Sequence, residues 1–92
     1  MSDDLLSRRR RAAYRASHRG TKEMDITLGR FADSALPGMP AETLALFERF
    51  LTLPDPDLQE MIWHPELEPG GEFAGLVAQV RAFHGLERAA NG

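Results

Sequence analysis

Groups that could carry out catalysis are scattered through this 92-residue chain, at spacings that match no active-site motif. The three histidines, His18, His64 and His84, lie in separate segments and lack the close spacing that brings metal ligands together. The absence of cysteine excludes disulfides, thiolate metal sites and cysteine nucleophiles. Nucleotide-binding glycine loops and the serine-hydrolase motif are absent as well. The sequence therefore predicts no catalytic residue and no metal site, and a protein that is not an enzyme.

The segment 19–26, which reads R-G-T-K-E-M-D-I, combines the most informative residue types and spacing. Local structure explains much of it. Gly20 can end one helix, because glycine readily adopts the left-handed conformation, and Thr21 can cap the next helix. Glu23 and Asp25 would then be acids in a first helical turn, near the positive end of the helix dipole. The segment therefore predicts a junction between two helices.

Ile26 is the residue that this junction does not explain. With a helical rotation of about 100° per residue, Ile26 lies about 200° from Met24, opposite an apolar stripe. Glu23 and Arg30 lie beside it, at about 260° and about 240°. The stripe consists of Met24, Leu28, Phe31 and Ala35. An isoleucine flanked by an acid and an arginine, opposite the expected core, favours a partner-binding patch.

Charge is divided unevenly along the chain. Residues 1–30 hold eight basic and four acidic side chains, whereas residues 31–92 hold three basic and ten acidic ones. A basic strip at helical spacing consists of Arg8, Arg11, Arg15 and His18. This strip leaves open an alternative function, a nucleic-acid-associated regulator or antitoxin-like protein. The isoelectric point near 5.5 opposes it, as do two acids where a recognition helix would meet phosphates, so no nucleic acid is expected.

Five helical segments must position these residues. Hydrophobic periodicity and turn signals place them at 4–18, 21–35, 41–53, 56–63 and 72–85. No segment shows the alternation of apolar and polar residues that is typical of a strand. The predicted fold is all-α, a compact five-helix bundle with a single domain over residues 1–92, in which residues 1–3 and 86–92 fray. No membrane span, signal peptide or transit segment is evident, so a soluble cytoplasmic protein is expected.

Two motifs along the chain point to a known family. The first is Arg-Arg-x-x-Tyr-Arg at 10–15, followed by Arg19-Gly20-x-x-Glu23-Met24-Asp25. The second is Asp55-Pro56-Asp57-Leu58, followed by Trp63. Together they resemble the SdhE family of small five-helix assembly factors. The resemblance implies a non-catalytic factor that binds the flavoprotein subunit of succinate dehydrogenase, and of fumarate reductase, and promotes covalent attachment of FAD to a histidine of that subunit.

The resemblance also implies which residues bind the partner. Arg19, Gly20 and Glu23 would form the centre of the contact surface, with Asp25 beside them. An arginine in place of Gly20 would hold the two surfaces apart while leaving helicity and melting nearly unchanged. The predicted partner-binding set is completed by Arg15, Ile26 and Arg30. We expect a monomer in the bacterial cytoplasm that holds no FAD stably itself.

Overall fold

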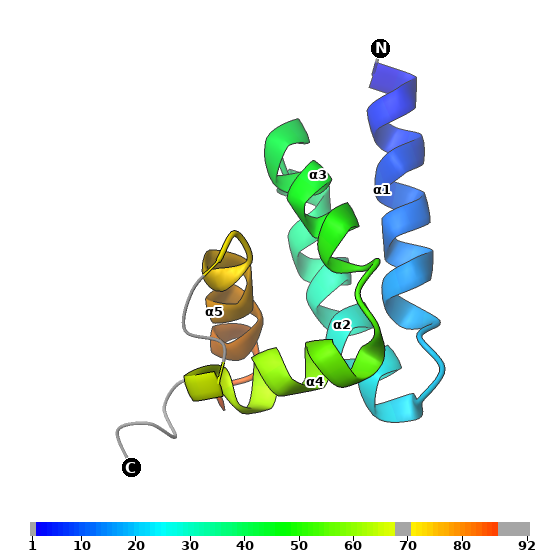
Figure 1. Ribbon diagram of the computed structural model, residues 1–92. Coiled ribbons are helices and arrows are strands. Elements are labelled where there is room, and N and C mark those ends of the chain that lie inside the picture. The colour runs from blue at the N-terminus through cyan, green and yellow to red at the C-terminus, as the bar shows by residue number, and fades with distance from the viewer. Residues whose placement is uncertain (1, 68–70, 87–92) are drawn as a thin grey trace. The chain divides into compact units, whose positions relative to one another are not determined.

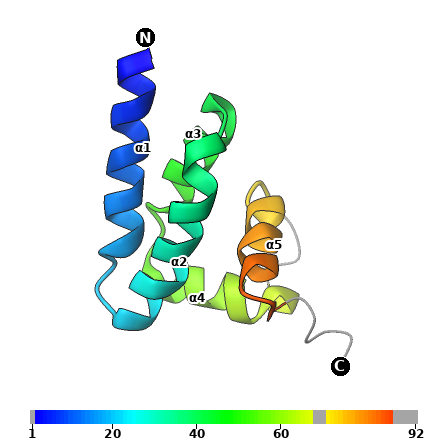
Figure 2. The ribbon, with the colours of Figure 1, turned by 180° about the vertical axis from the view of Figure 1, so that it is seen from behind.

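The computed structural model describes residues 2–67 and 71–86, and these contain five α-helices and no strand (Figures 1 and 2). The elements are α1 (Ser2–Ser17), α2 (Lys22–Ala35), η1 (Leu36–Gly38), α3 (Ala41–Phe50), α4 (Asp55–Trp63), η2 (Pro65–Leu67) and α5 (Ala74–Phe83). The predicted all-α fold with five helices is therefore confirmed. The chain forms two compact units, one ending at Thr52 and one beginning at Leu53, and a single domain stays a prediction. The fraying predicted for residues 2 and 3 is not found, because both lie in α1, and residue 86 is also described. The fraying predicted for residue 1 and residues 87–92 lies outside the described residues.

Helix boundaries differ from the predicted ones most clearly around a proline. α3 ends at Phe50, three residues before its predicted end: the N–H of Thr52 bonds to the carbonyl of Arg49 at 3.1 Å in a tightened turn, and Pro54 has no N–H for the carbonyl of Phe50. The carbonyl of Pro54 then accepts a helical hydrogen bond from the backbone N–H of Leu58 at 3.1 Å. α4 therefore begins one residue earlier than predicted. α1 begins two residues earlier than predicted, and α5 begins two residues later.

In the first unit, α1 and α2 lie antiparallel, and α3 contributes to the same apolar core (Figure 1). Met24, Leu28 and Phe31 of the predicted stripe are buried, which confirms that part of the prediction, whereas Ala35 at its end is half-buried. The ring of Phe31 packs against the ring of Phe47 in α3, with 5.9 Å between their centroids. This packing determines which face of α2 points outwards.

Two arginines in the middle of α1 bind other parts of the first unit, one within α3 and one just before it. Arg8 donates two hydrogen bonds to Glu48, from Nε to Oε2 at 3.1 Å and from Nη2 to Oε1 at 2.7 Å. Arg9 Nη2 donates to the carbonyl of Met39 at 2.8 Å. The hydrogen bond from Arg8 lowers the pKa of the Glu48 carboxyl below its ordinary value of 4.5, because that bond favours the ionised form. The first unit is thus tied together by charge as well as by its apolar core.

The Glu48→Gln variant should be less stable than the parent protein at neutral pH, by a few degrees of Tm at most, because the pair is only half-buried. A carboxyl whose pKa is lowered in the folded state contributes stability above its unfolded pKa and loses it as the pH falls through the folded value. The Tm difference should therefore disappear near pH 2. Circular dichroism melting at neutral pH and near pH 2 measures this. An equal Tm difference at both values would show that the ion pair does not cause it.

The second unit has a smaller set of buried side chains. They are Leu58 and Ile62 of α4 and Leu76, Val77 and Val80 of α5. The guanidinium of Arg81 in α5 donates to the carbonyl of Ile62, in the last turn of α4, where carbonyls lack helical partners. This contact ties the two helices of the unit together. Across the two described stretches, no helix is both long and apolar enough to cross a membrane.

Candidate functional site

The predicted helix junction is a tight corner between α1 and α2, which we define as residues 18–26. α1 ends at Ser17, and Gly20 has a φ of 128°, in the region that favours glycine. Thr21 caps α2, because its Oγ1 accepts a hydrogen bond from the backbone N–H of Met24 at 3.3 Å. The Thr21 cap is thus confirmed, whereas α1 ends one residue before its predicted end, α2 begins one residue after its predicted start, and Gly20 lies in the connecting turn, three residues after the end of α1.

The positive φ of Gly20 changes one expectation. Any L-residue at this position must adopt a conformation that costs about 1–3 kcal/mol. Substitution of Gly20 by arginine is therefore expected to lower stability, and the prediction of nearly unchanged melting must be revised. Binding experiments with variants of Gly20 mix two effects, strain in the turn and bulk on the surface.

Asp25 is bonded back to the corner. Its carboxylate Oδ1 accepts hydrogen bonds from the backbone N–H groups of Arg19 and Gly20, the latter at 3.3 Å. Asp25 is half-buried, and its own backbone N–H bonds to the carbonyl of Thr21 at 2.9 Å. One carboxylate therefore holds two consecutive peptide groups of the turn.

The guanidinium of Arg19 also has a partner within the first unit. Its Nη1 donates to the carbonyl of Leu51 at 2.6 Å. Leu51 is the C-cap residue of α3, where carbonyls have no helical partner and a cation is favoured by the helix dipole. Arg19 is half-buried as a result of this contact.

The other predicted residues are exposed. Glu23, Ile26 and Arg30 follow at helical spacing on one side of α2, which we call the exposed α2 face. Ile26 is 43% exposed, as predicted from its position opposite the stripe. Gly20 is exposed beside this face at the corner, and Arg15 is exposed in the last turn of α1. The exposed α2 face thus offers an acid, an aliphatic side chain and a base to a partner.

One feature of the site was not anticipated from the sequence. The rings of Tyr14 and His18 stack with 3.9 Å between centroids at an angle of 16°, and Tyr14 is 63% exposed. His18 Nδ1 lies 2.8 Å from the carbonyl oxygen of Tyr14 and 3.1 Å from Ser17 Oγ. The spacing of four residues on one helix is the signal that could have indicated the stack. An exposed aromatic pair therefore ends α1, next to the corner.

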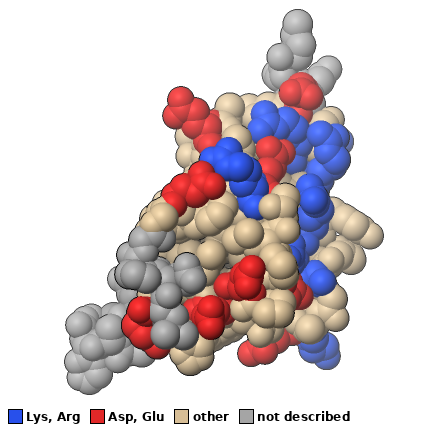
Figure 3. Space-filling view, viewed as in Figure 1, with Lys and Arg blue, Asp and Glu red and all other residues tan. Residues whose placement is uncertain are grey.

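The arginines of α1 divide into those bonded within the first unit and those that are exposed. Lys and Arg atoms gather in a band along α1 (Figure 3). Within it, Arg8 and Arg9 are hydrogen-bonded to other elements of the first unit, whereas Arg10, Arg11 and Arg15 are exposed. The charges of Arg8 and Arg9 therefore help to hold the first unit together.

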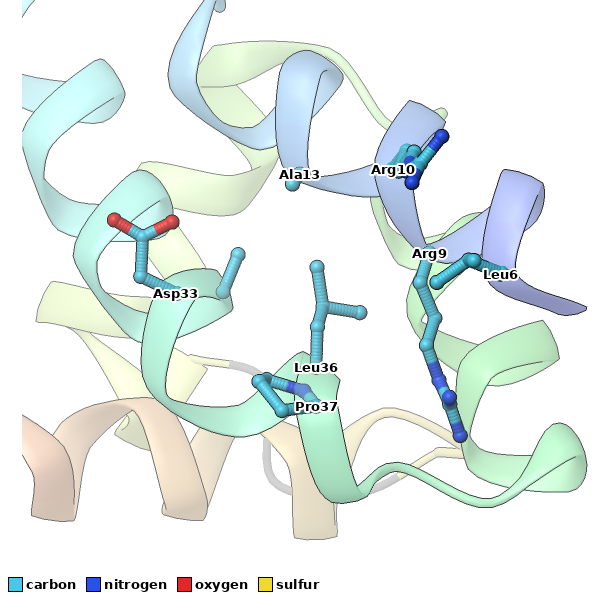
Figure 4. A pocket seen from close by; sticks show the side chains of 8 residues that line it. Leu6, Arg9, Arg10, Ala13, Asp33, Leu36 and Pro37 are labelled. Carbon is cyan, nitrogen blue, oxygen red and sulfur yellow. The ribbon is translucent and has the colours of Figure 1, made fainter.

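A shallow groove of about 400 Å³ lies between α1, the end of α2 and η1 (Figure 4). Leu36 occupies its middle, with Arg9 on one side and Asp33 on the other (Figure 4). Its other lining residues are Leu6, Arg10, Ala13, Ala32 and Pro37. This lining is apolar in its middle with charged groups around it, and it contains no serine, cysteine, histidine or lysine.

The helical fold and the exposed, internally braced corner are typical of a small helical binding protein. The chain belongs to the family described as "Flavinator of succinate dehydrogenase", which it matches over residues 10–84. The match includes the whole corner and the exposed α2 face. The resemblance to the SdhE family is therefore confirmed.

Two relatives carry the name "FAD assembly factor SdhE". The protein from Acetobacter pasteurianus is 44% identical over 61 residues, which are 66% of this chain and 56% of that protein. The protein from Shewanella oneidensis is 35% identical over 66 residues, which are 72% of this chain and 80% of that protein. The matched region thus spans little more than half of the first relative's length. No solved structure matches the chain significantly.

Proposed function

We propose that this protein is an assembly factor that binds the flavoprotein subunit of succinate dehydrogenase and promotes covalent attachment of FAD to it. The observation that carries the proposal is the family match over residues 10–84, within which the exposed corner lies. The names of both relatives support a role in FAD assembly. The proposal extends to the flavoprotein subunit of fumarate reductase. It also includes a bacterial cytoplasmic setting, a monomeric state and no stably bound FAD.

The chain's contribution is binding and orientation, because the attachment chemistry belongs to the flavin and to the flavoprotein. In the proposed complex, Ile26 inserts into an apolar depression, and Glu23 pairs with an arginine of the partner. Arg30 and Arg15 pair with carboxylates at the edge of the contact. Holding the flavoprotein in one conformation brings FAD and its acceptor histidine together productively.

The alternative, a nucleic-acid-associated regulator, depends on the basic strip. Its support is reduced at one member of the strip, because Arg8 already bonds to Glu48, which leaves two exposed arginines, Arg11 and Arg15. A phosphate-binding surface needs several unengaged cations on one face. The proposal therefore favours a protein partner.

A binding experiment separates the two functions. Purified chain is titrated into the isolated flavoprotein subunit and, separately, into double-stranded DNA. We expect saturable binding of the flavoprotein that weakens at least about tenfold in Ile26→Glu, because a charge replaces the apolar anchor. Leu6→Glu is the matched control, since Leu6 is 46% exposed, close to the 43% of Ile26, but lies near the start of α1. Tight, salt-sensitive binding of DNA without binding of the flavoprotein would overturn the proposal.

A further inference from the structure

We infer that Arg19 and Asp25 are positioning residues, which hold the corner rigid so that Gly20 and Glu23 meet the partner in one fixed arrangement. On this inference, the two charged side chains do not bind the partner through their own charges. The inference rests on the proposed function for the identity of the partner. Its structural part stands on contacts within the first unit alone.

The role of Asp25 follows from what its carboxylate binds. Oδ1 accepts two consecutive backbone N–H groups of the turn before α2, those of Arg19 and Gly20. These peptide groups lie outside any helix, so no regular hydrogen-bond ladder holds them. A glycine in the turn adds to their freedom. The carboxylate supplies charge-assisted hydrogen bonds in place of the regular ones. These bonds attach residues 19 and 20 to the first helical turn of α2.

The role of Arg19 follows from where its guanidinium lies. It donates to Leu51, the C-cap of α3, at a distance of 2.6 Å. The backbone of Arg19 is bound by Asp25 while its side chain is bound by α3. The corner is thus attached at two points, once to α2 and once to α3.

The consequence concerns the two residues that the corner presents to the proposed partner, Glu23 and Gly20. Both residues are exposed, and the carbonyl of Glu23 accepts a bond from Thr27 Oγ1 at 2.8 Å, within α2. A surface that is already ordered loses less conformational freedom on binding. We call the bonds of Asp25 and Arg19 that hold the corner the brace. Losing the brace should weaken binding, because the corner becomes less ordered, even if neither side chain touches the partner.

Two substitutions of Asp25 distinguish bracing from direct contact. Asp25→Asn keeps an oxygen that can accept both N–H groups but removes the charge, whereas Asp25→Ala removes the acceptor. We expect binding of the flavoprotein subunit within about threefold of the parent for Asp25→Asn and about tenfold weaker for Asp25→Ala. Asp33, an exposed acid of the same helix, provides the controls Asp33→Asn and Asp33→Ala. If Asp25→Asn binds as weakly as Asp25→Ala, the charge itself contacts the partner and the inference fails.

A second measurement tests the brace without the flavoprotein. Amide hydrogen exchange of Gly20, followed by NMR, should be slow in the parent and in Asp25→Asn and at least about tenfold faster in Asp25→Ala. Equal exchange in all three proteins would overturn the brace, whatever the partner is. If exchange follows the expected order but no form binds the flavoprotein, the brace stands and the proposed function fails.

Discussion

Replacing Glu23 by lysine is expected to weaken binding of the flavoprotein subunit by at least about 100-fold, equivalent to about 2.7 kcal/mol. Glu23 is exposed in the first turn of α2, and the corner is built without its side chain. Reversing its charge would place two like charges together at the centre of the proposed contact, which costs several kcal/mol. The loss should therefore appear in binding and not in folding.

Glu42 provides the matched control for this substitution. It is also an exposed glutamate in a first helical turn, that of α3. Glu42→Lys and Glu23→Lys lose the same favourable interaction with a helix dipole, about 0.3–1 kcal/mol, so their Tm values should fall together. Titration calorimetry should then show a loss of affinity only for Glu23→Lys. Equal affinities in the two variants would remove Glu23 from the interface.

The second large effect is expected at Gly29, on the buried side of α2. A Cβ atom there would lie 3.0 Å from Ser17 Cβ and 3.3 Å from Ser17 Cα, which places α1 and α2 in close contact. Valine adds two further methyl groups at this contact. We expect Gly29→Val to lower the free energy of unfolding by about 2–3 kcal/mol, since overpacking forces the helices apart. For a chain of this size, the Tm would fall by about 10–20 °C.

Gly75 provides the comparison for Gly29. It is also helical, in α5, but a Cβ atom there would have no neighbour within 4 Å. Gly75→Val should leave the stability nearly unchanged, because valine is slightly better than glycine in helices. Thermal unfolding of Gly29→Val and Gly75→Val gives the two Tm values to compare with that of the parent. A similar Tm in Gly29→Val and the parent would mean that the α1–α2 contact is not tight.

The sequence was sufficient to predict the helices and the outward face of α2. Apolar spacing placed Met24, Leu28 and Phe31 inside and Ile26 outside, and burial confirms all four. This succeeds because the faces of a helix follow from its periodicity alone. The predicted start of α4, after Pro54, was less accurate, because Asp55 and Pro56 could each be its first residue.

The internal bonds of the site could not be predicted from spacing. Arg19 and Leu51 are 32 residues apart, and Arg8 and Glu48 are 40 residues apart. Periodicity shows which side of a helix is buried, but it does not identify the residue that a charged side chain meets on another element. Asp25 is close in sequence to its two partners, yet an acid in a first helical turn is usually explained by the dipole alone. From the motif alone, the residues that hold the corner, Arg19 and Asp25, could therefore not be distinguished from its exposed residues.

Covalent flavin in the flavoprotein subunit of succinate dehydrogenase tests the central claim most directly. Cells lacking this protein are supplied with the parent chain, Glu23→Lys or Glu42→Lys, and flavin fluorescence is measured in the denatured subunit after gel electrophoresis. Denaturation removes noncovalent FAD, so the remaining fluorescence reports attachment. The account predicts that the signal is lost without the protein, restored by the parent and by Glu42→Lys, and not restored by Glu23→Lys. An undiminished signal in cells without the protein would contradict the proposed function.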